Sequence, residues 1–161
     1  MDTPSIRSKV AETASFFGIQ NWFEMEVSKL SGGQKQLLNL ASVMVMEPEL
    51  LLLDEPTSQL DPIAAEEFLS AIGRINRELG TTVLIAEHRL EELLSYGSRL
   101  LVMKDGRITA DGVPRDVALM LKNVGDGMFP AMPAPVRIWA GVPEGGTSCP
   151  WTVKELSLIH I

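Results

Sequence analysis

The chain has 161 residues, 45% hydrophobic and 22% charged, with a formal net charge of −7. This balance indicates a soluble globular domain with a sizeable core, and the acidic excess argues against nucleic acid as the main partner, because duplex binding draws on a basic face. No apolar run approaches the roughly 18 to 20 residues of a membrane span, the N-terminus has no signal-peptide pattern, and a single cysteine, Cys149, excludes an internal disulfide. We therefore expect a cytoplasmic protein.

The first predicted elements are two helices and a strand. Apolar side chains at helical spacing predict a helix over residues 4–17, with Gly18 as its cap. A second helix is predicted over residues 34–46, because Pro48 prevents its continuation. The almost unbroken aliphatic run at 49–54 predicts a strand buried on both faces, as in a parallel sheet.

The alternation of helix and strand then continues. Asp61 before Pro62 is a good helix start, and an apolar stripe predicts that this helix reaches Leu79. A β-branched strand is predicted over residues 81–86 and a short helix over 89–96. Two further strands are predicted as a hairpin, at 99–103 and 107–110. The order indicates an α/β domain whose helices pack on a mainly parallel sheet.

A last helix is predicted over residues 114–122, after which the composition changes. Gly, Pro and Met are frequent in residues 123–155, which is typical of a linker, although 136–140 has the composition of a strand. The final residues, 156–161, read LSLIHI, one translation of a transposon end sequence used in sequencing-library kits. We expect these six residues to be an adapter artefact, and a natural apolar tail is the alternative.

The first segment that carries chemistry comprises Ser31, Gly32, Gly33 and Gln34. Glycines let the backbone approach a phosphate closely, and the N-terminus of the following helix offers N–H groups and a positive dipole end. Ser31 adds a hydroxyl. Ser31 and Gln34 also have the spacing of a capping box, a purely structural interpretation. The two interpretations are compatible, because a capped helix N-terminus still binds anions.

The second segment is the acidic pair Asp54 and Glu55, which follows four leucines. An acid at the C-terminal end of a buried strand lies where ligands bind in open α/β sheets. Asp54 is placed to hold Mg²⁺ through water, and Glu55 to orient and polarise an attacking water. A strand that happens to end in an acidic turn is the structural alternative.

Two further positions have a plain structural interpretation beside a functional one. Ser58-Gln59-Leu60-Asp61 precedes Pro62, which makes Asp61 an N-cap before a proline at the first helical position. His88 follows the strand at 81–86, where a lone histidine is more often structural than functional.

The order and spacing of these segments over residues 1–122 resemble the nucleotide-binding domain of ATP-binding-cassette (ABC) proteins, which has a P-loop NTPase-like α/β fold. The resemblance implies that residues 1–30 end a helical subdomain and that 31–122 form the C-terminal part of the ATPase core. It also implies that the signature residues Ser31, Gly32, Gly33 and Gln34 contact the γ-phosphate of ATP held by an opposing cassette.

The same resemblance implies roles for the other motif residues. Asp54 corresponds to the Walker B acid that holds Mg²⁺ through water, and Glu55 to the general base. Ser58 and Asp61 belong to the D-loop between the two cassettes, and His88 is the switch residue that contacts the γ-phosphate.

A finer resemblance is to the ATPase subunits of energy-coupling-factor importers, which take up vitamins and transition metals. It rests on the residues before the strand at 49–54, on Glu87-His88-Arg89 and on the pattern of residues 103–112. It implies ATP and Mg²⁺ as cofactors and a peripheral position on the inner face of the cell membrane. The implied partners are a second cassette, a membrane-spanning coupling subunit and a small substrate-binding membrane protein. The segment at 129–150 looks like the linker between the two cassettes of a tandem subunit.

The sequence departs from the family pattern in one respect. It contains no G-x-x-x-x-G-K-[ST] loop and no clear Q-loop, both of which normally lie upstream of Met1. We therefore expect a C-terminal part of a cassette that has no measurable ATPase activity by itself. The alternatives are a soluble cassette protein acting on DNA or ribosomes, which the acidic balance disfavours, and a degenerate cassette acting as an interaction module, which Glu55 and His88 disfavour.

Overall fold

The computed structural model of the chain describes residues 3–88, 90–141, 149–150 and 152–155. The chain forms two compact units, Met1–Glu87 and His88–Ile161. The boundary falls inside the region 31–122 that the sequence assigns to one ATPase core. The six residues predicted to be an adapter artefact lie outside the described residues. Among the helices that the structure describes, none has the length and apolar character needed to cross a lipid bilayer.

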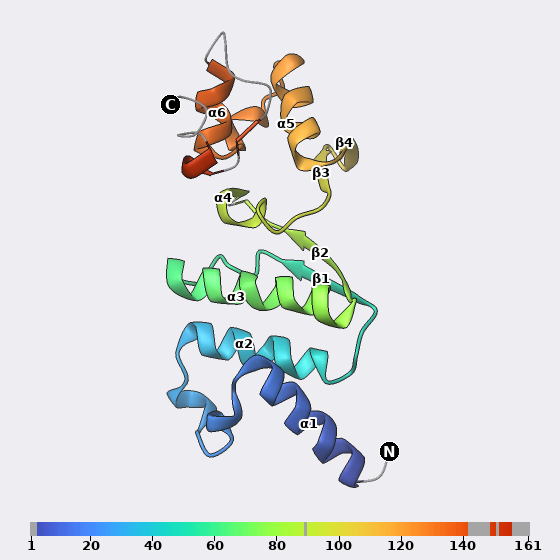
Figure 1. The fold of residues 1–161 in the computed structure, drawn as a ribbon, viewed down its shortest axis with the longest axis vertical. Helices are drawn as coiled ribbons and strands as arrows, with labels where there is room; N and C mark the ends of the chain where they lie inside the picture. The colour runs from blue at the N-terminus through green and yellow to red at the C-terminus, as the bar shows by residue number, and fades with distance from the viewer. Residues whose placement is uncertain (1–2, 89, 142–148, 151, 156–161) are drawn as a thin grey trace. The chain divides into compact units, whose positions relative to one another are not determined.

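The first unit begins with three helices that lie one on another (Figure 1). Helix α1, Thr3–Phe17, confirms the first predicted helix and ends at Gly18, whose φ is 70°. Helix α2, Gly32–Met44, packs against both α1 and α3, and α3 runs over Pro62–Arg74. Short 3₁₀ turns between α1 and α2 occupy Gln20–Trp22 (η1) and Val27–Lys29 (η2).

A parallel pair of strands lies on the side of α3 away from α2 (Figure 1). Strand β1, Leu50–Asp54, pairs with β2, Thr82–Ala86, in a register that places Asp54 opposite Ala86. Helix α3 therefore forms the crossover between two parallel strands, which confirms both predicted strands and their connection. Because the strands are parallel, their carboxyl ends meet at the same edge of the sheet.

The apolar stripe of α3 is shorter than predicted. A π-helical turn, Ile75–Leu79 (η3), follows α3 and changes the angular spacing of its side chains, so that Leu79 is 52% exposed, and Gly80 then ends the turn with a φ of 72°. The helical course therefore reaches Leu79 and ends at Gly80 as predicted, but the prediction that Leu79 belongs to the apolar stripe is wrong. The buried members of the stripe are Ala65, Phe68, Leu69, Ile72 and Ile75.

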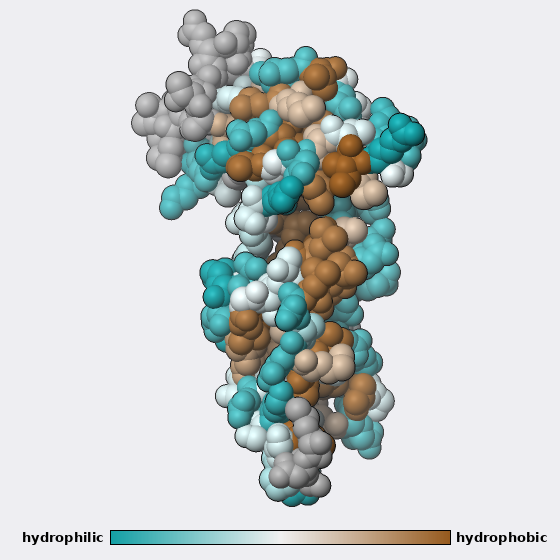
Figure 2. Space-filling model, turned by 90° about the vertical axis from the view of Figure 1, so that its right-hand side faces the viewer, coloured by the Kyte–Doolittle hydropathy of each residue, from teal (hydrophilic) through white to brown (hydrophobic). Residues whose placement is uncertain are grey.

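One face of the β1–β2 sheet is exposed, so the prediction that this strand is buried on both faces is wrong for the described residues. Leu51 is buried, whereas Leu50 and Leu52 are 53% and 64% exposed, as the two-residue period of a strand requires when one face is covered. Leu84, opposite Leu52 on β2, is also half exposed. Figure 2 shows hydrophobic residues gathered at the level of this pair of strands. By the same period, Asp54 lies on the exposed face with Leu52.

The second unit contains an antiparallel hairpin. Strand β3, Leu100–Lys104, pairs with β4, Arg107–Gly112, which confirms the predicted hairpin. Asp105 and Gly106 connect the strands with φ values of 52° and 74°, as a tight turn with two left-handed residues requires. The described strands thus comprise one parallel pair and one antiparallel pair.

Helices pack on this hairpin. Helix α4, Leu90–Leu93, is shorter than the predicted helix over 89–96, and α5, Pro114–Asn123, agrees with its prediction. A 3₁₀ turn, Phe129–Ala131 (η4), precedes α6, Ala134–Gly141. The alternative of a strand at 136–140 is therefore wrong. The core of this unit consists of Leu94, Val102, Ala110, Val117, Ala118, Leu121, Met132, Val136 and Cys149.

The segment after residue 123 contributes to that core, although its composition is typical of a linker. Met132 and Val136 are 3% and 1% exposed, and Lys122 lies over the ring of Trp139. Regularly spaced apolar residues are few in this segment, so the pattern did not indicate a packed helix. The prediction that it connects two cassettes is a separate matter and stays a prediction.

We predict that Gly106→Ala lowers the free energy of unfolding by about 1 to 2 kcal/mol, because alanine at a φ of 74° brings its Cβ too close to the backbone. Gly127→Ala is the matched control, since a Cβ there meets no atom within 4 Å and the residue is not left-handed. Urea denaturation of the two variants measures the difference. Equal losses of stability would contradict the turn described for this hairpin.

Candidate functional site

The signature segment at the N-terminus of α2 forms the predicted capping box. Ser31 Oγ accepts from the Gln34 N–H at 3.2 Å, and the Gln34 side-chain oxygen accepts from the Ser31 N–H at 2.8 Å. The first N–H groups of a helix have no acceptor within the helix, and those of Gly32 and Gly33 belong to this class. The capping box is therefore compatible with anion binding. The Ser31 hydroxyl accepts one hydrogen bond within the box, and its own proton can still be donated to an anion.

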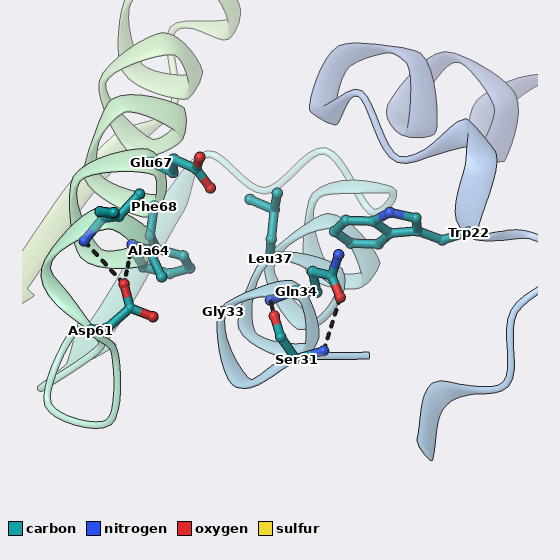
Figure 3. Close-up of a pocket in the computed structure, with 10 residues that line it drawn as sticks. Trp22, Ser31, Gly33, Gln34, Leu37, Asp61, Ala64, Glu67 and Phe68 are labelled. Carbon is teal, nitrogen blue, oxygen red and sulfur yellow. Dashed lines mark hydrogen bonds between the residues drawn. The ribbon is translucent and has the colours of Figure 1, made fainter. Parts of the chain in front are cut away.

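The second helix of the site begins at Asp61. Its carboxylate accepts from the N–H groups of Ile63 and Ala64 at 3.1 and 3.0 Å, which confirms the predicted N-cap of α3. In Figure 3 the N-terminal turns of α2 and α3 face one another, with Trp22 of η1 beside Gln34. They enclose a hollow of about 350 Å³ lined by Trp22, Ser31, Gly33, Gln34, Leu37, Asp61, Ile63, Ala64, Glu67 and Phe68.

Gly33 lies close to α3. A Cβ built on Gly33 would lie 2.7 Å from the Cβ of Ala64, which is closer than side chains pack. A Cβ on Gly32 would meet no atom within 4 Å. Gly33 therefore has a packing role in addition to any contact with phosphate, whereas the open surroundings of Gly32 leave room for a ligand.

The acidic pair lies at the carboxyl edge of the β1–β2 sheet. Asp54 ends β1, and Glu55 follows it with a φ of 43°, in the left-handed region that a residue with a side chain rarely adopts. The Glu55 N–H donates to the carbonyl of Ala86 at 2.9 Å, one residue beyond the ladder. Its carbonyl accepts from Ser58, from the N–H at 3.2 Å and from Oγ at 2.9 Å. Both carboxyl groups are exposed.

A third contact joins this turn to the end of β2. The N–H of Thr57 donates to Glu87 Oε1 at 3.1 Å, and the hydroxyl of Thr57 donates to the same oxygen. Thr57 is 5% exposed, one of two buried polar residues in the described chain, the other being Thr81. The sequence patterns predict no role for either Thr57 or Glu87. The 30 residues between them explain this, because sequence spacing gives no sign of the contact.

The described residues do not contain a cluster of three or more His, Cys, Asp and Glu side chains able to hold a metal ion. A single carboxylate such as that of Asp54 is enough for Mg²⁺ bound together with a nucleotide. Such an ion usually has one carboxylate, several waters and the phosphates of the substrate as ligands. An ion bound in this way neutralises charge on the phosphates of a nucleotide.

The structure therefore brings the predicted site residues into two groups within the first unit. Ser31, Gly33, Gln34 and Asp61 line the hollow between α2 and α3, while Asp54, Glu55 and Ser58 lie at the carboxyl edge of the sheet. A weak hydrogen bond of 3.4 Å from the Gln36 amide to the carbonyl of Pro56 runs from α2 to this edge. His88 is exposed and is the first residue of the second unit.

Comparison with known proteins gives a consistent result. The family model described as "ABC transporter" matches residues 4–58. An ABC transporter ATP-binding protein of Bacillus cereus is 46% identical over 95% of this chain, and one of Clostridium tetani is 34% identical over 96%. The chain spans only 27% and 34% of the lengths of these two proteins.

Solved structures agree with these relatives. CbiO1 of Clostridium perfringens, part of the ABC transporter complex CbiONQ, is 34% identical with a TM-score of 0.69, over 80% of this chain and 51% of its own. MJ1267, an ATP-binding cassette of an ABC transporter in its ADP conformation, is 26% identical with a TM-score of 0.69, over 88% of this chain and 52% of its own.

We predict that Gly33→Ala lowers the free energy of unfolding by about 1 to 3 kcal/mol, because its methyl group overlaps Ala64 and forces α2 and α3 apart. The neighbouring Gly32→Ala has no such overlap and is expected to leave stability within about 0.5 kcal/mol of the wild type. Denaturant titration of both variants tests this difference. A loss as large for Gly32→Ala as for Gly33→Ala would show that the contact with α3 does not matter.

Proposed function

Because the chain belongs to the ATP-binding-cassette family of ABC transporter ATP-binding proteins, we propose that its full-length protein hydrolyses ATP to drive import through a transporter of the energy-coupling-factor type. The observation that carries this proposal is the acidic turn at the carboxyl edge of the β1–β2 sheet. There Glu55 is exposed, next to Asp54, and held by hydrogen bonds in a left-handed conformation. Residues in such sparsely populated conformations cluster at active sites.

In this proposal Glu55 acts on water. Its carboxylate accepts a proton from, and orients, the water that attacks the γ-phosphate of ATP, as a general base. Asp54 would hold Mg²⁺ through water, and His88 would contact the γ-phosphate. Hydrolysis of a phosphoanhydride requires positioning and charge neutralisation more than covalent chemistry, and these side chains are suited to both.

The signature segment supplies contacts to a second nucleotide site. The Ser31 hydroxyl and the N–H groups of Gly32 and Gly33 are proposed to bind the γ-phosphate of ATP held by an opposing cassette, with Gln34 fixing the helix end. The capping box supports this proposal, because it positions these donors before any ligand arrives. Ser58 and Asp61 then belong to the D-loop at the interface between cassettes.

Relative chain lengths support a tandem arrangement. The chain spans 51% of CbiO1 but only 27% of the Bacillus cereus relative. A relative about twice as long as a single-cassette protein has room for two cassettes, so we propose that the opposing cassette lies in the same polypeptide. In this arrangement residues 1–30 are the end of a helical subdomain and residues 31–122 are the C-terminal part of the ATPase core. Residues 123–155 then form the linker to the next cassette.

The likeness to CbiO1 supports the importer type and the partners. These are a membrane-spanning coupling subunit and a small substrate-binding membrane protein, with the cassettes on the cytoplasmic face of the membrane. The proposed cargo is a vitamin or a transition metal, which the membrane protein and not this chain would recognise.

We predict that Glu55→Gln in the full-length protein lowers the turnover of ATP by about 10² to 10⁴-fold while ATP still binds, because the amide cannot accept the proton of the attacking water. Phosphate release measures turnover, and a fluorescent ATP analogue measures binding. Glu66→Gln, an exposed change on α3, is the control. Turnover near that of the wild type in Glu55→Gln would refute the role of Glu55.

A further inference from the structure

The turn that carries Glu55 is held by more than the sheet. Two of its contacts are made by the turn itself and by the ladder: Ser58 donates to the carbonyl of Glu55, and Glu55 donates to the carbonyl of Ala86. Two further contacts come from side chains outside the turn. The Gln36 amide donates to the carbonyl of Pro56 at 3.4 Å. Glu87, the residue that follows β2 by one position, reaches back to Thr57 and accepts two hydrogen bonds there.

We propose that Glu87 is a positioning residue for hydrolysis: through Thr57 it holds the turn that presents Glu55 to the attacking water. This inference rests on the proposed role of Glu55 as the general base. It assigns a task to two residues that no motif argument had singled out for catalysis, and it explains why a buried polar residue stands inside the acidic turn.

The chemistry of the contact suits this task. A carboxylate oxygen accepts two hydrogen bonds at once, and a charged acceptor makes them stronger than a neutral one would. Thr57 is nearly inaccessible to water, so if Glu87 were absent its N–H and hydroxyl would lose an acceptor that solvent cannot readily replace. The buried contact at Thr57 and the exposed residue Glu55 are therefore two residues apart in the same turn.

The backbone of Glu55 is the reason that such a contact is needed. A left-handed conformation at a residue with a side chain persists only when its surroundings over-determine it. Thr57 lies two residues after Glu55 and one before Ser58, so it is in the middle of the turn. If its anchor to Glu87 is removed, the turn can relax toward an ordinary conformation and the carboxylate of Glu55 moves from its position.

The structure contains a matched control. Thr81, 4% exposed, donates its hydroxyl to the carbonyl of Pro48 at 3.2 Å, at the opposite end of the same sheet. Thr57→Val and Thr81→Val each remove one hydroxyl from a buried threonine and keep the shape of the side chain. Both variants lose stability for the same reason, but only Thr57 adjoins the acidic pair.

The test uses the full-length protein and follows kcat and KM for ATP together with melting temperature. We expect Thr57→Val and Glu87→Leu each to lower kcat by about tenfold to a hundredfold, the size of effect that a small misplacement of a catalytic group produces. KM for ATP stays within about twofold, since the turn does not need to hold nucleotide. Thr81→Val lowers the melting temperature by about 2 to 8 °C, as Thr57→Val does, with kcat unchanged.

Conservative variants sharpen the result. Thr57→Ser keeps the hydroxyl and Glu87→Gln keeps an acceptor oxygen, so both are expected to restore most of kcat. The double variant Thr57→Val with Glu87→Leu is expected to be no slower than the worse single variant, because Glu87→Leu already removes the acceptor of the bond that Thr57→Val deletes.

Glu55→Gln measured alongside separates this inference from the proposed function. If Glu55→Gln is inactive but Thr57→Val and Glu87→Leu turn over like the wild type, the positioning role is wrong while the base assignment stands. A loss of kcat in Thr81→Val equal to that in Thr57→Val also overturns it, because general destabilisation would then explain both.

If Glu55→Gln is fully active, Glu55 is not the general base. Amide hydrogen exchange then tests directly whether the contact between Thr57 and Glu87 holds the turn. Faster exchange of the amides of Glu55, Thr57 and Ser58 in Glu87→Leu shows that Glu87 holds the turn, and unchanged exchange overturns the inference.

Discussion

The parallel pairing of β1 with β2 is the interaction on which the first unit depends. It places Asp54 opposite Ala86, so that the two chain segments leave the sheet side by side at its carboxyl edge. The Glu55 N–H then extends the ladder by one hydrogen bond to the Ala86 carbonyl at 2.9 Å. Helix α3 connects the strands, and the cap of that helix, Asp61, begins where the acidic turn ends. The edge of the sheet, the acidic turn and the start of α3 therefore follow one another along the chain. The pairing of β1 with β2 determines where this stretch begins.

Local strain and local hydrogen bonding oppose each other in that stretch. A left-handed residue with a side chain costs about 1 to 3 kcal/mol. Glu55 is in this conformation, and the hydrogen bonds of its N–H and its carbonyl act to keep it there. A buried threonine in the same turn has both its hydroxyl and its amide bonded to a carboxylate. Several hydrogen bonds thus stabilise the conformation of one residue, Glu55. Such an arrangement is expected where a carboxylate must be held in a fixed position.

Local signals in the sequence were enough to predict the capping box at Ser31, the N-cap at Asp61 and the hairpin at Gly106, because each depends on residues within a few positions of one another. Contacts between distant positions were not predictable in this way. The bond between Thr57 and Glu87 joins residues 30 positions apart and has no spacing rule. The exposed face of β1 was missed for a related reason: an aliphatic run fits a doubly buried strand and a half-buried one equally well, and only the packing around it distinguishes them.

The tight contact of Gly33 with Ala64 has a consequence for motion. Since no space remains between α2 and α3 at this point, neither helix can slide or tilt there without displacing the other. The N-terminus of α2 carries the signature segment, and the N-terminus of α3 follows directly from the acidic turn. The tight contact at Gly33 therefore couples the position of the signature segment to that of the residues that follow the acidic turn.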